Sequence, residues 1–171
     1  MFGPIPAQFN DPIGEYEIRG LELTGTVTLM KSLELFAGAT KLDAKTNGNN
    51  GIEIDHMPYT PEFQFQAGGK LTFLKKFRLY ADIQYLHDLY QGTTFRTGTF
   101  NFTDPGAANK LGDITLVNAR LSYLFDYAPM YLKASEVFVA VNNIFDQDYE
   151  YAKGYPMPGT TVFGGLIVKF Q

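Results

Sequence analysis

The sequence of 171 residues contains no cysteine and no tryptophan. Without cysteine the chain can form neither a disulfide framework nor a thiolate metal site. Its formal net charge is −4 and its basic residues are scattered, which argues against nucleic-acid binding, because that needs a concentrated positive surface. No apolar run approaches the roughly 18–20 residues that a membrane helix requires.

The sequence also offers little for catalysis or for binding a metal or cofactor. The two histidines, His56 and His87, share no ligand spacing, and the acidic pair Asp146 and Asp148 lacks the remaining oxygen ligands of a calcium loop. Serine is scarce, and no nucleophile elbow or acid–base pair is evident. We therefore expect no enzyme, no cofactor and no metal site.

What the chain does contain is period-two alternation in repeated blocks. In residues 20–30 one face carries Leu, Leu, Gly, Val and Leu, and the opposite face carries Glu and three Thr. Similar blocks lie at 63–74, 77–88, 114–125 and 161–170, and two that alternate poorly lie at 33–43 and 135–144. The sequence thus predicts seven strands, several of them longer than the roughly 9–11 residues of a tilted membrane crossing.

Short and long connections alternate strictly between these strands. The short ones lie near 30–32, 74–76 and 126–133, and the long ones, at 44–61, 90–112 and 145–159, are rich in Gly, Asn, Asp, Pro and Tyr. Tight periplasmic turns and long extracellular loops are typical of an outer-membrane barrel. The fold class we predict is therefore all-β, an antiparallel transmembrane β-barrel in the bacterial outer membrane, with aromatic girdles near the strand ends at Tyr80, Tyr85, Tyr90, Tyr123, Phe125, Tyr127 and Tyr131.

The last third of the chain carries a more specific pattern. Residues 137–149 read Val-Phe-Val-Ala-Val-Asn-Asn-Ile-Phe-Asp-Gln-Asp-Tyr, residues 154–159 read Gly-Tyr-Pro-Met-Pro-Gly, and a final strand ends in Phe170. This order resembles the C-terminal signature of TonB-dependent outer-membrane receptors, and upstream pieces at 19–23, 59–74 and 116–123 resemble the same family. Three features depart from its pattern: Thr160 replaces the usual Arg, Gln171 follows the final aromatic, and nothing resembles the plug domain or the energy-coupling box.

The resemblance implies that residues 1–171 are the C-terminal part of a receptor barrel of roughly 22 strands, without a plug. It implies uptake of a scarce nutrient, most often a ferric siderophore. The partners implied are the lipid bilayer, the barrel-assembly machinery at the C-terminal strand, the rest of the barrel and plug, and TonB acting through the plug. Residues 1–6 do not read as a signal peptide, so we expect that a leader has been removed or that Met1 is not the natural start.

Two sets of residues are candidates for function. The first, expected to shape the last loop and strand, is Asn142, Asn143, Phe145, Asp146, Tyr149, Tyr155, Pro156, Gly159 and Phe170. The second, expected in loops where a ligand could be stacked or hydrogen-bonded, is Tyr149, Tyr151, Tyr155 and His56.

Two other interpretations remain open at this point. One is a complete small barrel of eight strands, an anchor or adhesin, although residues 2–14 with three prolines are a poor eighth strand. The other is a soluble ligand-binding β-protein, since any half-buried sheet alternates. The polar faces of the predicted strands are mostly Thr, Gln, Asn and Ser, which favours a hydrated lumen over a charged outer surface.

Overall fold

A computed structural model describes residues 13–48, 53–54, 59–90, 110–127 and 132–170. The predicted architecture is confirmed: these residues form seven long antiparallel strands in one sheet, with a two-residue strand paired to the second of them. The strands are β1 (Ile13–Met30), β2 (Leu33–Gly48), β3 (Glu53–Ile54), β4 (Phe63–Phe73), β5 (Phe77–Tyr90), β6 (Lys110–Tyr127), β7 (Leu132–Asn142) and β8 (Thr161–Ile167). The described residues include no helix long and apolar enough to cross a membrane.

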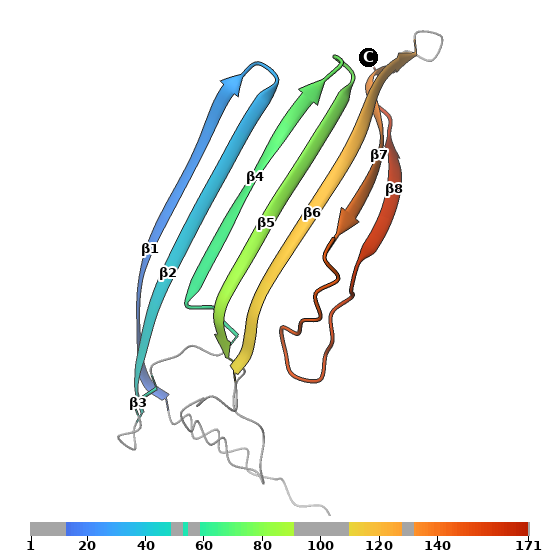
Figure 1. The fold of residues 1–171 in the computed structure, drawn as a ribbon. Helices are drawn as coiled ribbons and strands as arrows, with labels where there is room; N and C mark the ends of the chain where they lie inside the picture. The colour runs from blue at the N-terminus through green and yellow to red at the C-terminus, as the bar shows by residue number, and fades with distance from the viewer. Residues whose placement is uncertain (1–12, 49–52, 55–58, 91–109, 128–131, 171) are drawn as a thin grey trace, which may run out of the picture.

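The long strands follow one another across the sheet in chain order, each hydrogen-bonded to the next. The sheet curls along this path, with β1 at one edge and β8 at the other (Figure 1). The tight turns after β1 and β4 lie at one end, and the long connection between β7 and β8 lies at the opposite end (Figure 1). This is the asymmetry of turns and loops that the sequence predicts.

The two faces of the sheet differ sharply in polarity. One register row crosses all seven long strands on what we call the outer face and is apolar throughout: Val27, Leu35, Gly69, Ala81, Ala119, Val141 and Val162. The neighbouring row on the other face, the inner face, is mostly polar: Thr28, Glu34, Lys70, Tyr80, Arg120, Ala140 and Phe163. Outer-face leucines are strongly exposed, 75% at Leu21 and 74% at Leu23, as expected of a surface that faces lipid.

The poor alternation of 33–43 and 135–144 has a structural cause. Phe36 and Phe138 lie on the inner face, and the register partner of each is a glycine, Gly68 and Gly165. A Cβ at either glycine would lie 2.6 Å from the ring of its partner. The two rings therefore occupy the space that a side chain at each glycine would fill, which explains why apolar residues occur on the polar face.

The strands extend beyond the predicted blocks at their loop ends. The first strand begins at Ile13 instead of residue 20, and β2 runs to Gly48, because these segments pair with each other. Backbone pairing needs no apolar side chain, so the alternation fades before the strand ends. At the other end of the chain β8 stops at Ile167, three residues before Phe170, and Lys169 donates its backbone N–H to the Ser135 hydroxyl instead of to a backbone carbonyl (3.2 Å).

Of the aromatic residues predicted for the girdles, Tyr123 lies on the outer face near a strand end, Tyr80 does not, and Tyr131 lies outside the described residues. Phe73, Phe77 and Tyr123 are register partners beside the tight turns, and the Phe77 and Tyr123 ring centroids lie 5.1 Å apart. Tyr80 instead lies on the inner face, where its ring stacks on Phe36 at 6.0 Å. The alternation in residues 77–88 already places Tyr80 on the polar face, opposite Leu79 and Ala81, so the girdle prediction conflicted with the strand pattern at this position.

Candidate functional site

Asn143, the first residue after β7, holds the last loop against the sheet by hydrogen bonds. Its amide donates to the Gln147 carbonyl (2.9 Å) and accepts from the Gln147 N–H (3.0 Å), while its own N–H donates to Asn118 Oδ1 (3.1 Å). The residue is 3% exposed and has a positive φ of 50°, a conformation that Asn tolerates better than most residues. Asn143 therefore nucleates the turn that leaves the strand.

Asp146 closes the same loop from the other side. Its Oδ1 accepts the backbone N–H of Thr160 (2.7 Å), and the Thr160 hydroxyl donates to the Asn143 carbonyl (2.8 Å). Thr160 occupies the position where the family pattern has Arg, and here it joins the two ends of the loop. A Cβ on Gly159 would lie 2.3 Å from Asp146 Oδ1, so this close approach requires glycine.

Gly159→Ala is therefore expected to break the Asp146–Thr160 contact. A hydrogen bond to a charged group contributes about 1.5–3 kcal/mol, so the loop should open more often and trypsin should cleave faster after Lys153. Cleavage of the folded receptor in outer membranes, followed on gels, measures this. Gly25→Ala is the control, because nothing lies within 4 Å of a Cβ there; equal cleavage rates in the two variants would contradict the assignment.

Gln147 ties this loop to the edge of β6. Because β7 pairs with β6 only as far as Ala119, the edge of β6 nearer the loops has no strand partner on that side among the described residues. There Gln147 Oε1 accepts from the Thr115 N–H (2.7 Å), and Gln147 Nε2 donates to the Asp113 carbonyl (3.1 Å). Ile144 donates its N–H to the Val117 carbonyl (2.9 Å). The loop thus completes the hydrogen bonding of an otherwise open edge.

The three loop tyrosines proposed for ligand contact occupy different environments. Tyr149 packs against a small buried cluster of Leu89, Ile114 and Leu116. Tyr151 contacts the Tyr149 ring edge to face at 5.4 Å, and burial raises the pKa of its hydroxyl, with Tyr149 adding to the rise. Tyr155 is 74% exposed. Tyr155 is therefore the tyrosine of the three with a ring most available to a ligand.

The other predicted residues have different environments. Asn142 is exposed and lines a hollow on the inner face, so it has a different environment from its neighbour Asn143. Pro156 forms an isolated bridge with Glu150 inside the loop, while Phe145 and Phe170 are each 74% exposed. His56 lies outside the described residues.

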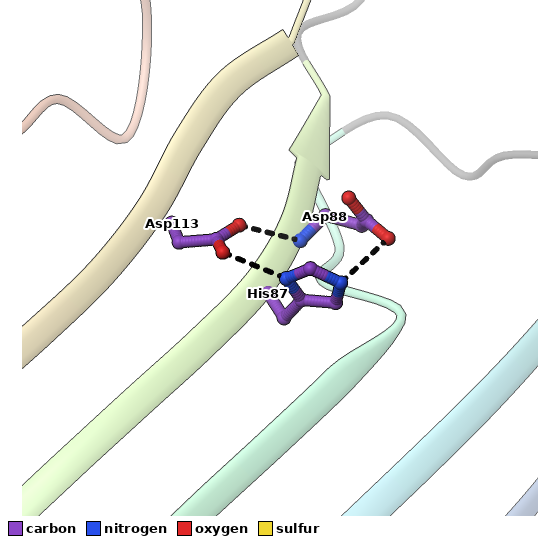
Figure 2. Close-up of side chains that lie close together, drawn as sticks. All are labelled: His87, Asp88 and Asp113. Atoms are coloured by element: carbon purple, nitrogen blue, oxygen red, sulfur yellow. Dashed lines mark hydrogen bonds and ion pairs between the residues drawn. The ribbon is translucent and has the colours of Figure 1, made fainter.

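A polar cluster that the sequence did not reveal lies where β5 and β6 approach the loops. Figure 2 shows His87 between two carboxylates: its Nδ1 is 2.8 Å from Asp113 Oδ2, and its Nε2 is 3.0 Å from Asp88 Oδ2. One ligand atom from each residue lies within 4.8 Å of the others, so the three could offer a histidine and two carboxylates to a divalent cation. Both ring nitrogens of His87 already face carboxylate oxygens within hydrogen-bond distance, however.

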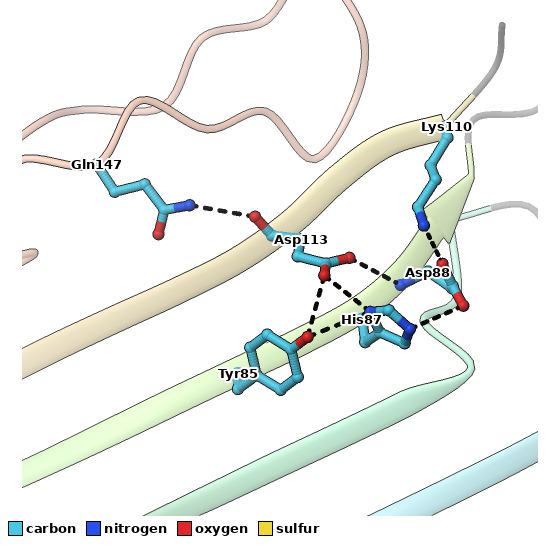
Figure 3. Close-up of polar contacts among 6 residues, drawn as sticks. All are labelled: Tyr85, His87, Asp88, Lys110, Asp113 and Gln147. Carbon is cyan, nitrogen blue, oxygen red and sulfur yellow. Dashed lines mark hydrogen bonds and ion pairs between the residues drawn. The ribbon is translucent and has the colours of Figure 1, made fainter. Parts of the chain in front are cut away.

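Neighbouring side chains complete this cluster as an ion-pair network. Lys110 pairs with Asp88, the Tyr85 hydroxyl donates to Asp113 Oδ2 (3.0 Å), and Gln147 reaches the Asp113 backbone (Figure 3). These side-chain contacts link β5, β6 and the last loop. The adjacent pair His87-Asp88 at a strand end was the available signal, but only the β5–β6 register brings Asp113 beside it.

The inner face also forms a hollow of about 650 Å³. Its polar lining includes the ion pair of Arg120 with Glu136, and also Lys70, which pairs at 3.1 Å with Glu34 beside the hollow. Asn118 donates to Asp82 across the strands (2.9 Å). The hollow shows that the inner face can receive a group from outside the sheet.

Comparison with known proteins identifies relatives of this chain. A family profile described as "TonB dependent receptor-like, beta-barrel" matches residues 2–144. The chain is 27% identical over 154 residues to the "Ferrichrome outer membrane transporter/phage receptor" of Escherichia coli (strain K12), an alignment that covers 87% of this chain. It spans only 19% of that relative's length.

Proposed function

Because this chain belongs to the TonB-dependent receptor β-barrel family and lies in the bacterial outer membrane, we propose that it forms the last part of the barrel wall of a nutrient-uptake receptor. The observation that carries this proposal is the register row that is apolar on the outer face of all seven long strands, opposite a polar inner face. A lipid-facing wall around a hydrated lumen has this arrangement.

The open sheet supports a partial barrel over a complete small one. Among the described strands, β1 and β8 are edges and are not paired with each other. Every backbone group in hydrocarbon needs a partner, so further strands must complete the wall. In this proposal residues 1–171 contain no plug; the remaining strands and a plug belong to the same receptor, TonB acts through that plug, and Phe170 contacts the barrel-assembly machinery.

We infer that the nutrient is a ferric siderophore, which the similarity to a ferrichrome transporter supports. This role needs no catalytic group. Growth of an iron-starved host with ferrichrome as the iron source, with and without the intact receptor, tests it. Loss of growth that returns with the receptor is the expected result, and unchanged growth in the deletion strain would contradict a ferrichrome receptor.

Within this proposal Tyr155 contacts the ligand. Its side chain is 74% exposed, and a hydrogen bond from its hydroxyl contributes about 0.5–1.5 kcal/mol, so Tyr155→Ala should weaken siderophore binding by about 2- to 12-fold. Equilibrium binding of labelled ferrichrome to outer membranes measures this. Met157→Ala is the control, since it trims a half-exposed side chain of the same loop that has no ring; equal affinities in the two variants would remove Tyr155 from the site.

A further inference from the structure

The Arg78 guanidinium on the inner face is short of acceptors. Its Nη1 lies 3.8 Å from Glu136 Oε2, beyond hydrogen-bond distance, and its Nε is buried without a hydrogen-bond partner among the described residues. The side chain as a whole is 39% exposed. Arginine carries five N–H donors in a rigid fork, and a buried donor without an acceptor is costly. The environment of Arg78 is therefore incomplete.

The carboxylate nearest to Arg78 is already taken by another arginine. Glu136 pairs with Arg120, which also donates to the Ser122 hydroxyl (3.3 Å) and lies 3.7 Å from the centre of the Phe138 ring. Two guanidiniums thus share one carboxylate, and the cluster carries one unmatched positive charge.

The other acids around the hollow have partners as well. Asp82 accepts from Asn118, and Glu34 pairs with Lys70. Neither of these carboxylates pairs with Arg78, and Glu22 on the same face lies on β1, three strands away from Arg78 in the sheet order. The described sheet therefore leaves Arg78 Nε without an acceptor, and the inner-face hollow is open to one from outside the sheet.

We propose that Arg78 binds a carboxylate that enters the inner-face hollow. A carboxylate matches the planar guanidinium fork and can accept two N–H groups at once. Apolar walls formed by Phe36, Tyr80 and Phe163 lower the local dielectric constant and strengthen such a pair. The carboxylate is either a free organic acid or an Asp or Glu side chain from another part of the polypeptide. The proposal depends on the barrel fold and not on which nutrient is carried, so a negative ferrichrome assay does not affect it.

The first arm of the test looks for a free acid. The receptor purified from outer membranes is titrated with sodium succinate against sodium chloride at matched ionic strength, and its thermal unfolding midpoint is followed. A free-acid site predicts that succinate raises the midpoint of the wild type by a few degrees. Arg78→Gln should lose that response, and Arg19→Gln should keep it, because Arg19 is an exposed arginine on β1 paired with Glu17.

The second arm looks for a carboxylate of the same polypeptide. Arg78→Lys places an amine at the site, and a carbodiimide then joins that amine to any carboxylate in direct contact with it. Mass spectrometry identifies the partner. An internal site predicts a cross-link to an acidic residue other than Glu136, together with no succinate response in the wild type and a lower midpoint for Arg78→Gln than for Arg19→Gln.

Either pattern supports the proposal and says where the carboxylate comes from. An equal succinate response in the wild type and Arg78→Gln would overturn it. So would the absence of both a succinate response and a cross-link beyond Glu136.

Discussion

Trypsin should cleave Asn143→Ala after Lys153 at least about 30-fold faster than it cleaves the unaltered receptor. The substitution removes both side-chain hydrogen bonds to Gln147, each contributing about 0.5–1.5 kcal/mol. It also places alanine at a φ of 50°, which costs roughly 1–2 kcal/mol. We expect the free energy of opening the loop to fall by about 2–5 kcal/mol, and cleavage of a transiently open segment follows that free energy.

Asn142→Ala is the matched control for this prediction. Asn142 is the same residue type one position earlier, but it is exposed and has a negative φ. Its substitution should change the cleavage rate little. If the two variants were cleaved equally fast, the closed conformation of the loop would not depend on the Asn143 hydrogen bonds. The role that we assign to Asn143 would then be wrong.

Glu136→Ala should lower the amount of folded receptor in the outer membrane more than any other substitution considered for this sheet. Glu136 is 8% exposed and faces both Arg120 and Arg78. Removing one partner of a buried ion pair costs about 3–5 kcal/mol, because the remaining charge loses its counter-ion. Heat-modifiable mobility on gels gives the folded fraction, and urea unfolding of the purified receptor gives the free energy.

Glu34→Ala is the control, because Glu34 forms an ion pair with Lys70 on the same face, but both side chains are 42% exposed. An exposed pair contributes about 0–1 kcal/mol, so this variant should fold almost normally. If Glu34→Ala and Glu136→Ala lowered the free energy of unfolding by the same amount, burial would not determine how much these ion pairs contribute to stability.

The strands and their connections could be predicted from the sequence because alternation follows directly from facing lipid on one side and water on the other. Residues 20–30, 63–74 and 77–88 each lie within a strand of the structure, except that Leu74 begins the turn. The blocks with weak alternation were harder, because Phe36 and Phe138 sit over glycines of neighbouring strands. That arrangement depends on register, which a single strand does not encode.

Side-chain contacts of the candidate site were predictable only within the last loop. Asn143, Asp146 and Gly159 are close in sequence, and turn chemistry indicates their roles. His87 and Asp113 are 26 residues apart, and they meet only because β5 and β6 pair with a register shift between Leu86 and Leu89. The sequence indicated only that His56 and His87 share no ligand spacing, and the contacts of His87 with Asp113 could not be predicted for this reason. Likewise, Tyr149 reads as a loop residue but packs on a core formed by β5 and β6.

The way the last loop is held has a consequence for transport. A flap that opens for a passing ligand must separate from its neighbours at little cost in free energy. The start of the last loop, at Ile144 and Gln147, instead hydrogen-bonds to the backbone edge of β6, and moving it would expose backbone groups at Thr115 and Val117. We therefore expect the last loop to stay fixed at the extracellular entrance of the barrel during transport. Any segments of the receptor that move would then lie elsewhere.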